Sequence, residues 1–152
     1  MSLRALLIVA LLAFGLPVSA SAEPSTLELF AKRSFLSLPA VPAVGAGFVG
    51  GGELLDAAGA KVGDGDTYCG IVRVTTDIPP AVIAQCTSVY RLKDGELHLS
   101  SLRTYRPVAL AFDDCVVAVI GGTGAYSTAR GDGKFTKLTD PDRAYKVSLT
   151  IS

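Results

Sequence analysis

The sequence predicts an all-β domain, either a closed barrel or a sandwich, and three observations carry that prediction. Apolar and polar residues alternate with a period of two in Glu96–Tyr105 and again in Ala144–Ile151. Turn signals such as Asp94-Gly95 separate short runs of strand-forming residues. No long segment has the period of a helix. Short strands with short turns are typical of barrels and sandwiches, and a barrel also removes exposed sheet edges.

Residues 1–22 have the pattern of a secretory signal peptide. Arg4 supplies a positive start, Ala5–Leu16 is a continuous apolar run, and Ala20-Ser21-Ala22 offers the small residues of a cleavage site. The apolar run is shorter than the roughly 20 residues that a membrane span needs, which leaves an uncleaved anchor as the less favoured alternative. We expect an exported, extracytoplasmic protein that begins near Glu23 and has no membrane association after cleavage.

Residues 23–47 are expected to form a flexible N-terminal leader. Ser25-Thr26-Leu27-Glu28 resembles a helix capping box, so that Leu27–Ser37 could make one or two helical turns. Two prolines and a glycine follow and prevent regular structure. Lys32-Arg33 is interpreted as a solvated pair. The barrel domain is then assigned to residues 48–152.

From Phe48 onward, β-forming runs alternate with turn residues. In Ala144–Ile151 the four apolar residues that begin with Tyr145 share one face of the predicted strand. The expected strands are Gly50–Asp56, Thr67–Thr75, Ala81–Lys93, Glu96–Tyr105, Cys115–Ile120, Tyr126–Leu138 and Ala144–Ile151.

Charge and size limit the possible partners. The chain has 14 basic and 14 acidic residues in 152, and removal of the leader with Arg4 leaves it close to neutral. Neutrality without a basic cluster argues against nucleic acid and against anionic membrane surfaces. About 130 mature residues suffice for one domain with one core.

The cysteines predict one disulfide. Cys69 and Cys86 lie near the middle of consecutive predicted strands, and in an oxidising compartment two of the three cysteines should pair. Closing a loop of about 17 residues stabilises by roughly 3 kcal/mol. Cys115 then stays unpaired, and Asp113-Asp114 beside it disfavour a thiolate, so we interpret it as a buried thiol. One histidine and three scattered cysteines match no metal-ligand spacing.

A glycine-rich string, Gly121-Gly122-Thr123-Gly124, follows the apolar run Cys115–Ile120. A phosphate-binding loop needs Lys and then Ser or Thr after its last glycine, whereas Ala125-Tyr126-Ser127 follows here. A dinucleotide fingerprint needs a following helix, which this composition disfavours. The string is therefore interpreted as a sharp corner between two strands.

The segment from Gly121 to Gly131 resembles the GGTG-x-[FY]-x-x-[AG]-x-G signature of dirigent proteins and allene oxide cyclases. The resemblance extends over Phe48–Ser152. It implies a small antiparallel, eight-stranded, calycin-like β-barrel that uses no cofactor and takes a small apolar molecule, with a homo-oligomer possible. Some dirigent proteins carry an acid in the glycine corner where this chain has Gly124. The plant cyclase's plastid fatty-acid substrate is not transferred to an exported chain.

Candidate site residues come from polar side chains on strands. His98 is the only histidine, so no Ser-His-Asp or Cys-His arrangement is possible, and its alternation beside Glu96 places it on the surface. In an apolar lumen, acids, tyrosines and arginines could serve as general acids or bases or as oxyanion donors. The polar strand residues are Glu53, Asp56, Tyr68, Arg73, Gln85, Tyr90, Arg91, Arg103, Tyr105, Tyr126 and Arg130. The resemblance selects Glu53 or Asp56, together with Tyr126 and Arg130, as the catalytic candidates.

Three functions fit this sequence. The first is a barrel that holds a reactive apolar molecule and steers its cyclisation or coupling. The second is a secreted small-ligand carrier without turnover. The third is a structural barrel filled by its own side chains. Fold alone does not separate them.

Overall fold

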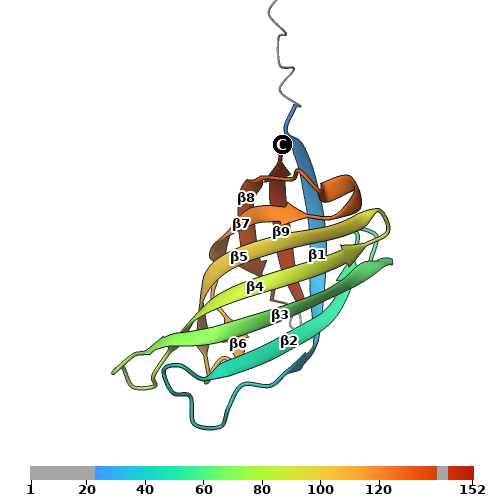
Figure 1. The fold of residues 1–152 in the computed structure, drawn as a ribbon. Helices are drawn as coiled ribbons and strands as arrows, with labels where there is room; N and C mark the ends of the chain where they lie inside the picture. Colours follow the sequence, from blue (N-terminus) through green and yellow to red (C-terminus); the bar gives the residue numbers. More distant parts are fainter. Residues whose placement is uncertain (1–22, 140–143) are drawn as a thin grey trace, which may run out of the picture.

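Eight long strands form the body of the molecule in the computed structural model, which describes residues 23–139 and 144–152. The predicted signal peptide lies outside the described residues. A two-residue strand, β6, and one turn of 3-10 helix, η1, complete the fold (Figure 1). The elements are β1 Ser25–Leu36, β2 Gly47–Leu55, β3 Lys61–Val74, β4 Val82–Leu92, β5 Gly95–Arg106, β6 Ala111–Phe112, β7 Cys115–Gly122, η1 Gly124–Tyr126, β8 Gly131–Lys137 and β9 Ala144–Ile151.

The strands close into a single antiparallel barrel. Their order is β4-β3-β2-β1-β9-β8-β7-β5, and β5 returns to pair with β4, while β6 pairs only with the end of β5. Apart from β6, each strand of the described chain therefore has a hydrogen-bonded neighbour on both sides, so that closure leaves no long free edge. The eight-stranded antiparallel barrel predicted from the sequence is confirmed.

The N-terminal segment corrects the sequence interpretation. Residues 25–36 form β1, between β2 and β9, rather than a helical turn in a flexible leader. Leu27, Leu29 and Ala31 have a period of two, and Leu29 packs in the core. Glu28, interpreted as part of a capping box, instead forms an ion pair with Lys146 at 2.7 Å. The barrel thus begins at Ser25 and not at Phe48.

The strand after the glycine corner is shorter than expected, and β3 is longer. Tyr126 belongs to η1, and β8 begins only at Gly131, because Gly124 takes a φ of +57° and tightens the corner into a turn of 3-10 helix. On the other side, β3 begins at Lys61, since its glycines pair regularly with β2 and β4.

The inward faces make one continuous core. Alternate residues of β4, β5, β7 and β9 are buried, and the predicted inward face of β9, which begins with Tyr145, is confirmed. Aromatic rings gather among them: Phe135 stacks on Tyr145 with centroids 4.5 Å apart, and Tyr105 meets Phe112 edge-on at 5.2 Å. Within residues 23–139 and 144–152, no helix is long and apolar enough to cross a membrane.

The glycine string packs two turns against each other. A Cβ added at Gly124 would lie 2.4 Å from the Asp94 carbonyl oxygen, and one at Gly95 would lie 2.2 Å from that of Thr123. These contacts hold the β4–β5 hairpin against the corner that follows β7. The string therefore packs the corner that follows β7 tightly against the β4–β5 turn.

We expect Gly124→Ala to destabilise the protein by about 2 kcal/mol, because it combines a left-handed backbone, worth roughly 1–2 kcal/mol, with the carbonyl clash. Urea unfolding measures the effect. Gly59→Ala, with a φ of +82° and no atom within 4 Å, isolates the backbone contribution. Gly70→Ala, in open space on a strand, serves as the control. An effect of Gly124→Ala no larger than that of Gly59→Ala would contradict the packing role.

Candidate functional site

A small cavity lies inside the barrel. It holds about 60 Å³, enough for roughly four to six water molecules at about 10–15 Å³ each. Aromatic rings and two arginines give it its chemical character. Its lining residues are Ala31, Lys32, Arg33, Leu36, Phe48, Gly50, Gly51, Gly52, Glu53, Leu54, Gly65, Thr67, Cys69, Tyr90, Arg103, Phe112, Phe135 and Tyr145.

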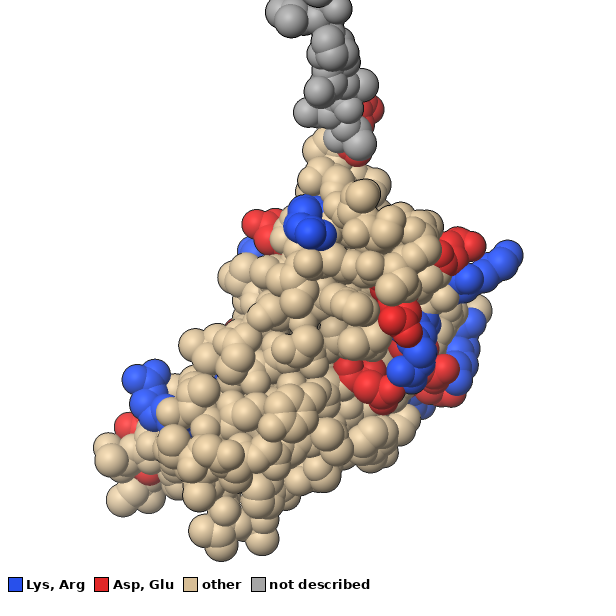
Figure 2. All heavy atoms as spheres, in the orientation of Figure 1, with Lys and Arg blue, Asp and Glu red and all other residues tan. Residues whose placement is uncertain are grey.

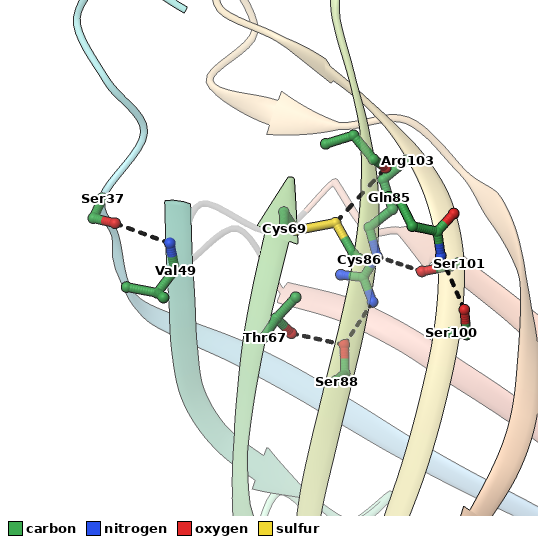
Figure 3. Close-up of a disulfide and its surroundings, with 11 residues drawn as sticks. Ser37, Val49, Thr67, Cys69, Gln85, Cys86, Ser88, Ser100, Ser101 and Arg103 are labelled. Carbon is green, nitrogen blue, oxygen red and sulfur yellow. Dashed lines mark hydrogen bonds between the residues drawn. A yellow bond between two sulfur atoms is a disulfide. The ribbon is translucent and has the colours of Figure 1, made fainter. Parts of the chain in front are cut away.

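Arg103 of β5 is the central polar group of this cavity. The residue is 4% exposed. Its Nε donates to Ser101 Oγ at 2.8 Å and one Nη donates to Ser88 Oγ at 2.9 Å, so that both acceptors are hydroxyls (Figure 3). The guanidinium also lies 4.6 Å from the ring centroid of Phe135, within the range of a cation–π contact.

No carboxylate within residues 23–139 and 144–152 pairs with Arg103. The described ion pairs of arginine lie elsewhere, at Arg91–Asp66 and Arg106–Asp113, where the side chains are about half exposed. An arginine does not deprotonate in proteins, so Arg103 keeps its positive charge inside the barrel. Burying a charge without a counter-charge costs several kcal/mol after relaxation. The lumen thus carries a positive charge that its described side chains do not neutralise.

Arg33 adds a second guanidinium to the same cavity. It lies beside a bulge in β1, where the register shifts between Arg33 and Phe35. Its Nη2 donates to the carbonyl oxygen of Leu110 at 2.9 Å, and Leu110 has a left-handed φ of 49°. Its Nη1 is buried without a hydrogen-bond partner among the described residues. The sequence interpretation of Lys32-Arg33 as a solvated pair is therefore wrong for Arg33.

One face of the outer surface carries side chains of both charges. On the face shown in Figure 2, blue and red side chains are interspersed, and a broad surface carries neither. His98 lies on the outer surface, 3.4 Å from Glu96, as the alternation predicted.

The tyrosines of the lumen differ in their roles. Tyr145 accepts a hydrogen bond from the backbone N–H of Phe112 at 3.0 Å, which fixes β6 against β9. Burial raises the pKa of Tyr90, and the charge of Arg103 only partly offsets that rise. Tyr90 is therefore a neutral phenol at physiological pH, able to donate to a ligand oxygen.

The predicted disulfide is confirmed and lies on the inward face. Cys69 and Cys86 are register partners on β3 and β4, and their sulfur atoms are bonded (Figure 3). Both residues are almost fully buried, and Cys69 lines the cavity. The disulfide thus ties two strands together directly beside the Arg103 site.

Cys115 is a free, partly buried thiol, as the sequence predicted. Burial raises its pKa, Arg103 opposes this, and Asp114 adds to the rise. The folded protein thus holds the proton more tightly than the unfolded chain, whose cysteine pKa is about 8.5. The associated stability is complete below that pH and is lost as pH rises toward the raised pKa.

We therefore expect the free energy of unfolding to fall between pH 7.5 and 9.5, and to fall less in Cys115→Ala. Urea unfolding at both pH values measures this. Tyr90, whose ordinary pKa is about 10, contributes only above that interval. An equal fall in both proteins would contradict the assignment.

The four catalytic candidates from the sequence are not brought together. Glu53 lines the cavity but is 46% exposed at its side chain and lies 3.5 Å from Lys61 Nζ. Asp56 accepts hydrogen bonds from the N–H groups of Ala58 and Ala60, which makes it a turn residue. Tyr126 and Arg130 follow the glycine corner and do not line the cavity. Arg130 instead donates to the carbonyl oxygen of Ala129. The catalytic roles of these residues remain predictions.

Arg103 and Tyr90 are among the polar strand residues found in the sequence, but they were not selected as catalytic candidates. The signal was present, because Arg103 continues the Leu97–Leu99–Ser101 inward alternation of β5. An arginine on the apolar phase of a strand indicates a buried guanidinium. Arg33 was missed because β1 itself was not predicted.

The chain shares its fold with solved structures of other proteins. No protein-family model matches the chain, and no curated protein matches it. Among solved structures, a pyocyanin demethylase matches with a TM-score of 0.67 and 23% identity, over 84% of this chain and 100% of that one. The fold is shared. At such low identity the likeness supports no statement about activity.

Two further structures match in the same way. AbnU, titled an exo-specific intermolecular Diels-Alderase, matches with a TM-score of 0.61 and 16% identity, over 86% of this chain and 98% of that one. AbmU, a Diels-Alderase from Streptomyces koyangensis, matches with a TM-score of 0.54 and 17% identity, over 87% of this chain and 69% of that one. The eight-stranded barrel implied by the glycine string is thereby confirmed at the level of the fold.

Proposed function

We propose that this chain is a secreted barrel that binds a small, largely apolar molecule in its lumen and steers the cyclisation or coupling of that molecule without a cofactor. The observation that carries the proposal is the cavity itself, in which aromatic walls surround one buried guanidinium. Apolar walls with a few placed polar groups are the usual composition of small-molecule sites. Two structures of the same fold are titled Diels-Alderases, which catalyse a cyclisation, and a third is titled a demethylase.

The residues of the lumen would act in two ways. Phe48, Phe112 and Phe135 restrict the conformations of a bound molecule, which lowers the entropic part of a barrier. Arg103 and the neutral phenol of Tyr90 would donate hydrogen bonds to an oxygen on which negative charge develops. The buried Ser88 and Ser101 hydroxyls position Arg103 for this.

A non-catalytic carrier is the second candidate, and one observation favours it. Glu53, the cavity-lining carboxylate of the described chain, is half exposed and forms an ion pair with Lys61, so it does not have the desolvated setting of a buried general base. Restriction and hydrogen bonding by Arg103 would remain, and these support binding as well as turnover.

Native mass spectrometry of the mature protein from its own host tests the proposal. We expect one small aromatic or conjugated molecule per barrel, released on denaturation. Protein that is free of ligand, and that also binds neither a hydrophobic dye nor benzene, would indicate a barrel filled by its own side chains.

A cavity-filling variant gives the matched control. Gly50 faces the lumen, and a Cβ there would lie 3.1 Å from the flexible end of Leu36. Gly50→Val should therefore occupy the cavity and abolish binding, with a loss of at least about tenfold in affinity. Gly70→Val, in open space on β3, should leave binding unchanged. Equal binding by both variants would place the ligand outside the lumen.

A further inference from the structure

We propose that the molecule bound in the lumen is an aromatic oxyanion, a single ring bearing a carboxylate or phenolate oxygen that is held by Arg103 and Arg33. This inference rests on the proposed function and specifies its ligand class. It adds a charge requirement, which a barrel for merely apolar molecules does not have.

The cavity has an unneutralised positive charge. Two guanidinium groups line one cavity of about 60 Å³, and neither has a salt-bridge partner among the described residues. Arg103 is nine-tenths buried or more, and its described hydrogen-bond acceptors are two neutral hydroxyls. Coulomb interactions are much stronger here than in water. The attraction of an anion to Arg103 would therefore offset much of the hydration energy that the guanidinium lost on burial.

The groups near Arg103 do not supply a compensating negative charge. Tyr90 and Cys115 both interact electrostatically with Arg103. Burial raises the pKa of each, so both remain neutral at physiological pH. Glu53 lines the cavity, but its carboxylate interacts with Lys61. Within the described chain, the lumen therefore lacks an internal counter-ion for Arg103.

Both lumen arginines have N–H donors that no described residue accepts. Arg103 commits Nε and one Nη to serines, which fixes its plane through the chain Thr67–Ser88–Arg103–Ser101 (Figure 3). Its other Nη has no described hydrogen bond, and Arg33 has a buried Nη1 without a partner in the described residues. Guanidinium N–H groups bind carboxylate oxygens with strong, charge-assisted hydrogen bonds. Two arginines thus provide donors for one small oxyanion.

The walls of the cavity favour an aromatic ligand. The walls around Arg103 are the rings of Phe48, Phe112 and Phe135, with Phe48 and Phe112 stacked at 6.3 Å between centroids. Aromatic walls favour an aromatic partner by offset stacking or edge contacts. The cavity, about 60 Å³ in volume and open to solvent, is smaller than the roughly 150 Å³ that enclose a benzene ring, so a ligand of one ring would lie only partly within it.

Matched small probes test the charge requirement on the mature, full protein. Calorimetric titration compares benzoate with its neutral isostere benzamide and with the cation benzamidine. We expect benzoate to bind at least about tenfold more tightly than benzamide, and benzamidine to show no binding. A second pair, 4-nitrophenolate and 4-nitroanisole, distinguishes a phenolate site from a carboxylate site.

Variants connect the preference to the arginines. Arg103→Met should remove the benzoate preference, while Arg103→Lys should retain part of it. Arg73→Met, which removes an exposed arginine on β3, is the matched control and should change nothing. If Arg103→Met does not fold, Arg33→Met tests the inference instead. We expect it to lower the ratio of benzoate affinity to benzamide affinity at least about threefold.

The outcomes separate the two proposals. Equal binding of benzoate and benzamide would overturn the oxyanion inference and leave the proposed function standing. No binding of any probe, neutral ones included, would overturn both. A preference that survives loss of both lumen arginines would place the anion elsewhere and would also overturn the inference.

Discussion

Arg103→Met is expected to leave the ligand-free barrel at least as stable as the wild type, and up to about 3 kcal/mol more stable. The physical reason is that a buried charge without a described counter-ion costs more in lost hydration than its two serine hydrogen bonds and its ring contacts return. A methionine fills a similar volume without that cost and adapts to irregular gaps. Urea unfolding of ligand-free protein measures the difference.

The control is Arg73→Met, an exposed substitution that should change stability by less than about 0.5 kcal/mol. A destabilisation of Arg103→Met by about 3 kcal/mol or more would contradict the account, because it would mean that the protein itself supplies a partner for this charge. Together with the predicted loss of anion preference, the expected result would make Arg103 a residue kept for binding at the expense of stability.

Loss of the disulfide is the second large effect that we expect. The double variant Cys69→Ala, Cys86→Ala opens a loop with a sequence separation of 17 residues, which the chain-entropy model values at about 3 kcal/mol. Both cysteines face the core, so the truncation also removes buried contacts next to the cavity. We expect a total loss of about 3–5 kcal/mol in urea unfolding.

Cys115→Ala provides the comparison, because that thiol is free and only partly buried. Its loss should cost about 1 kcal/mol or less. A double variant as stable as Cys115→Ala would show that the disulfide contributes little to the barrel.

The architecture could be predicted from the sequence because most strands have a recognisable local pattern. In Ala144–Ile151 and Glu96–Tyr105, period-two alternation marks the inward face directly, and the observed burial follows it. Cys69 and Cys86 could be paired because consecutive antiparallel strands place mid-strand residues side by side. These are short-range signals, and each agrees with the fold.

The strand β1 was not predicted because its sequence carries both a helix-start pattern and a strand pattern. Ser25–Glu28 has the composition of a helix start, whereas the alternation of Leu27, Leu29 and Ala31 belongs to a strand. Pairing with β2 and β9, distant in the chain, decides between them. Such long-range pairing is invisible to a local pattern, and Arg33 was missed with it.

The candidate site was predicted less well than the fold, for a related reason. The resemblance of the glycine string selected Tyr126 and Arg130, yet in the structure that string packs against the β4–β5 turn. The cavity lies among residues from β1, β2, β3, β4, β5, β6, β8 and β9. Only the three-dimensional closure of the barrel brings Arg33 and Arg103 to one cavity.

The most direct test of the lumen site is a crystal structure of the mature protein grown with 4-bromobenzoate, whose bromine locates the ring by anomalous scattering. The account predicts one bromine inside the barrel, with the carboxylate within hydrogen-bond distance of Arg103. A bromine found only on the outer surface, or a ring in the lumen whose carboxylate points away from both arginines, would contradict it.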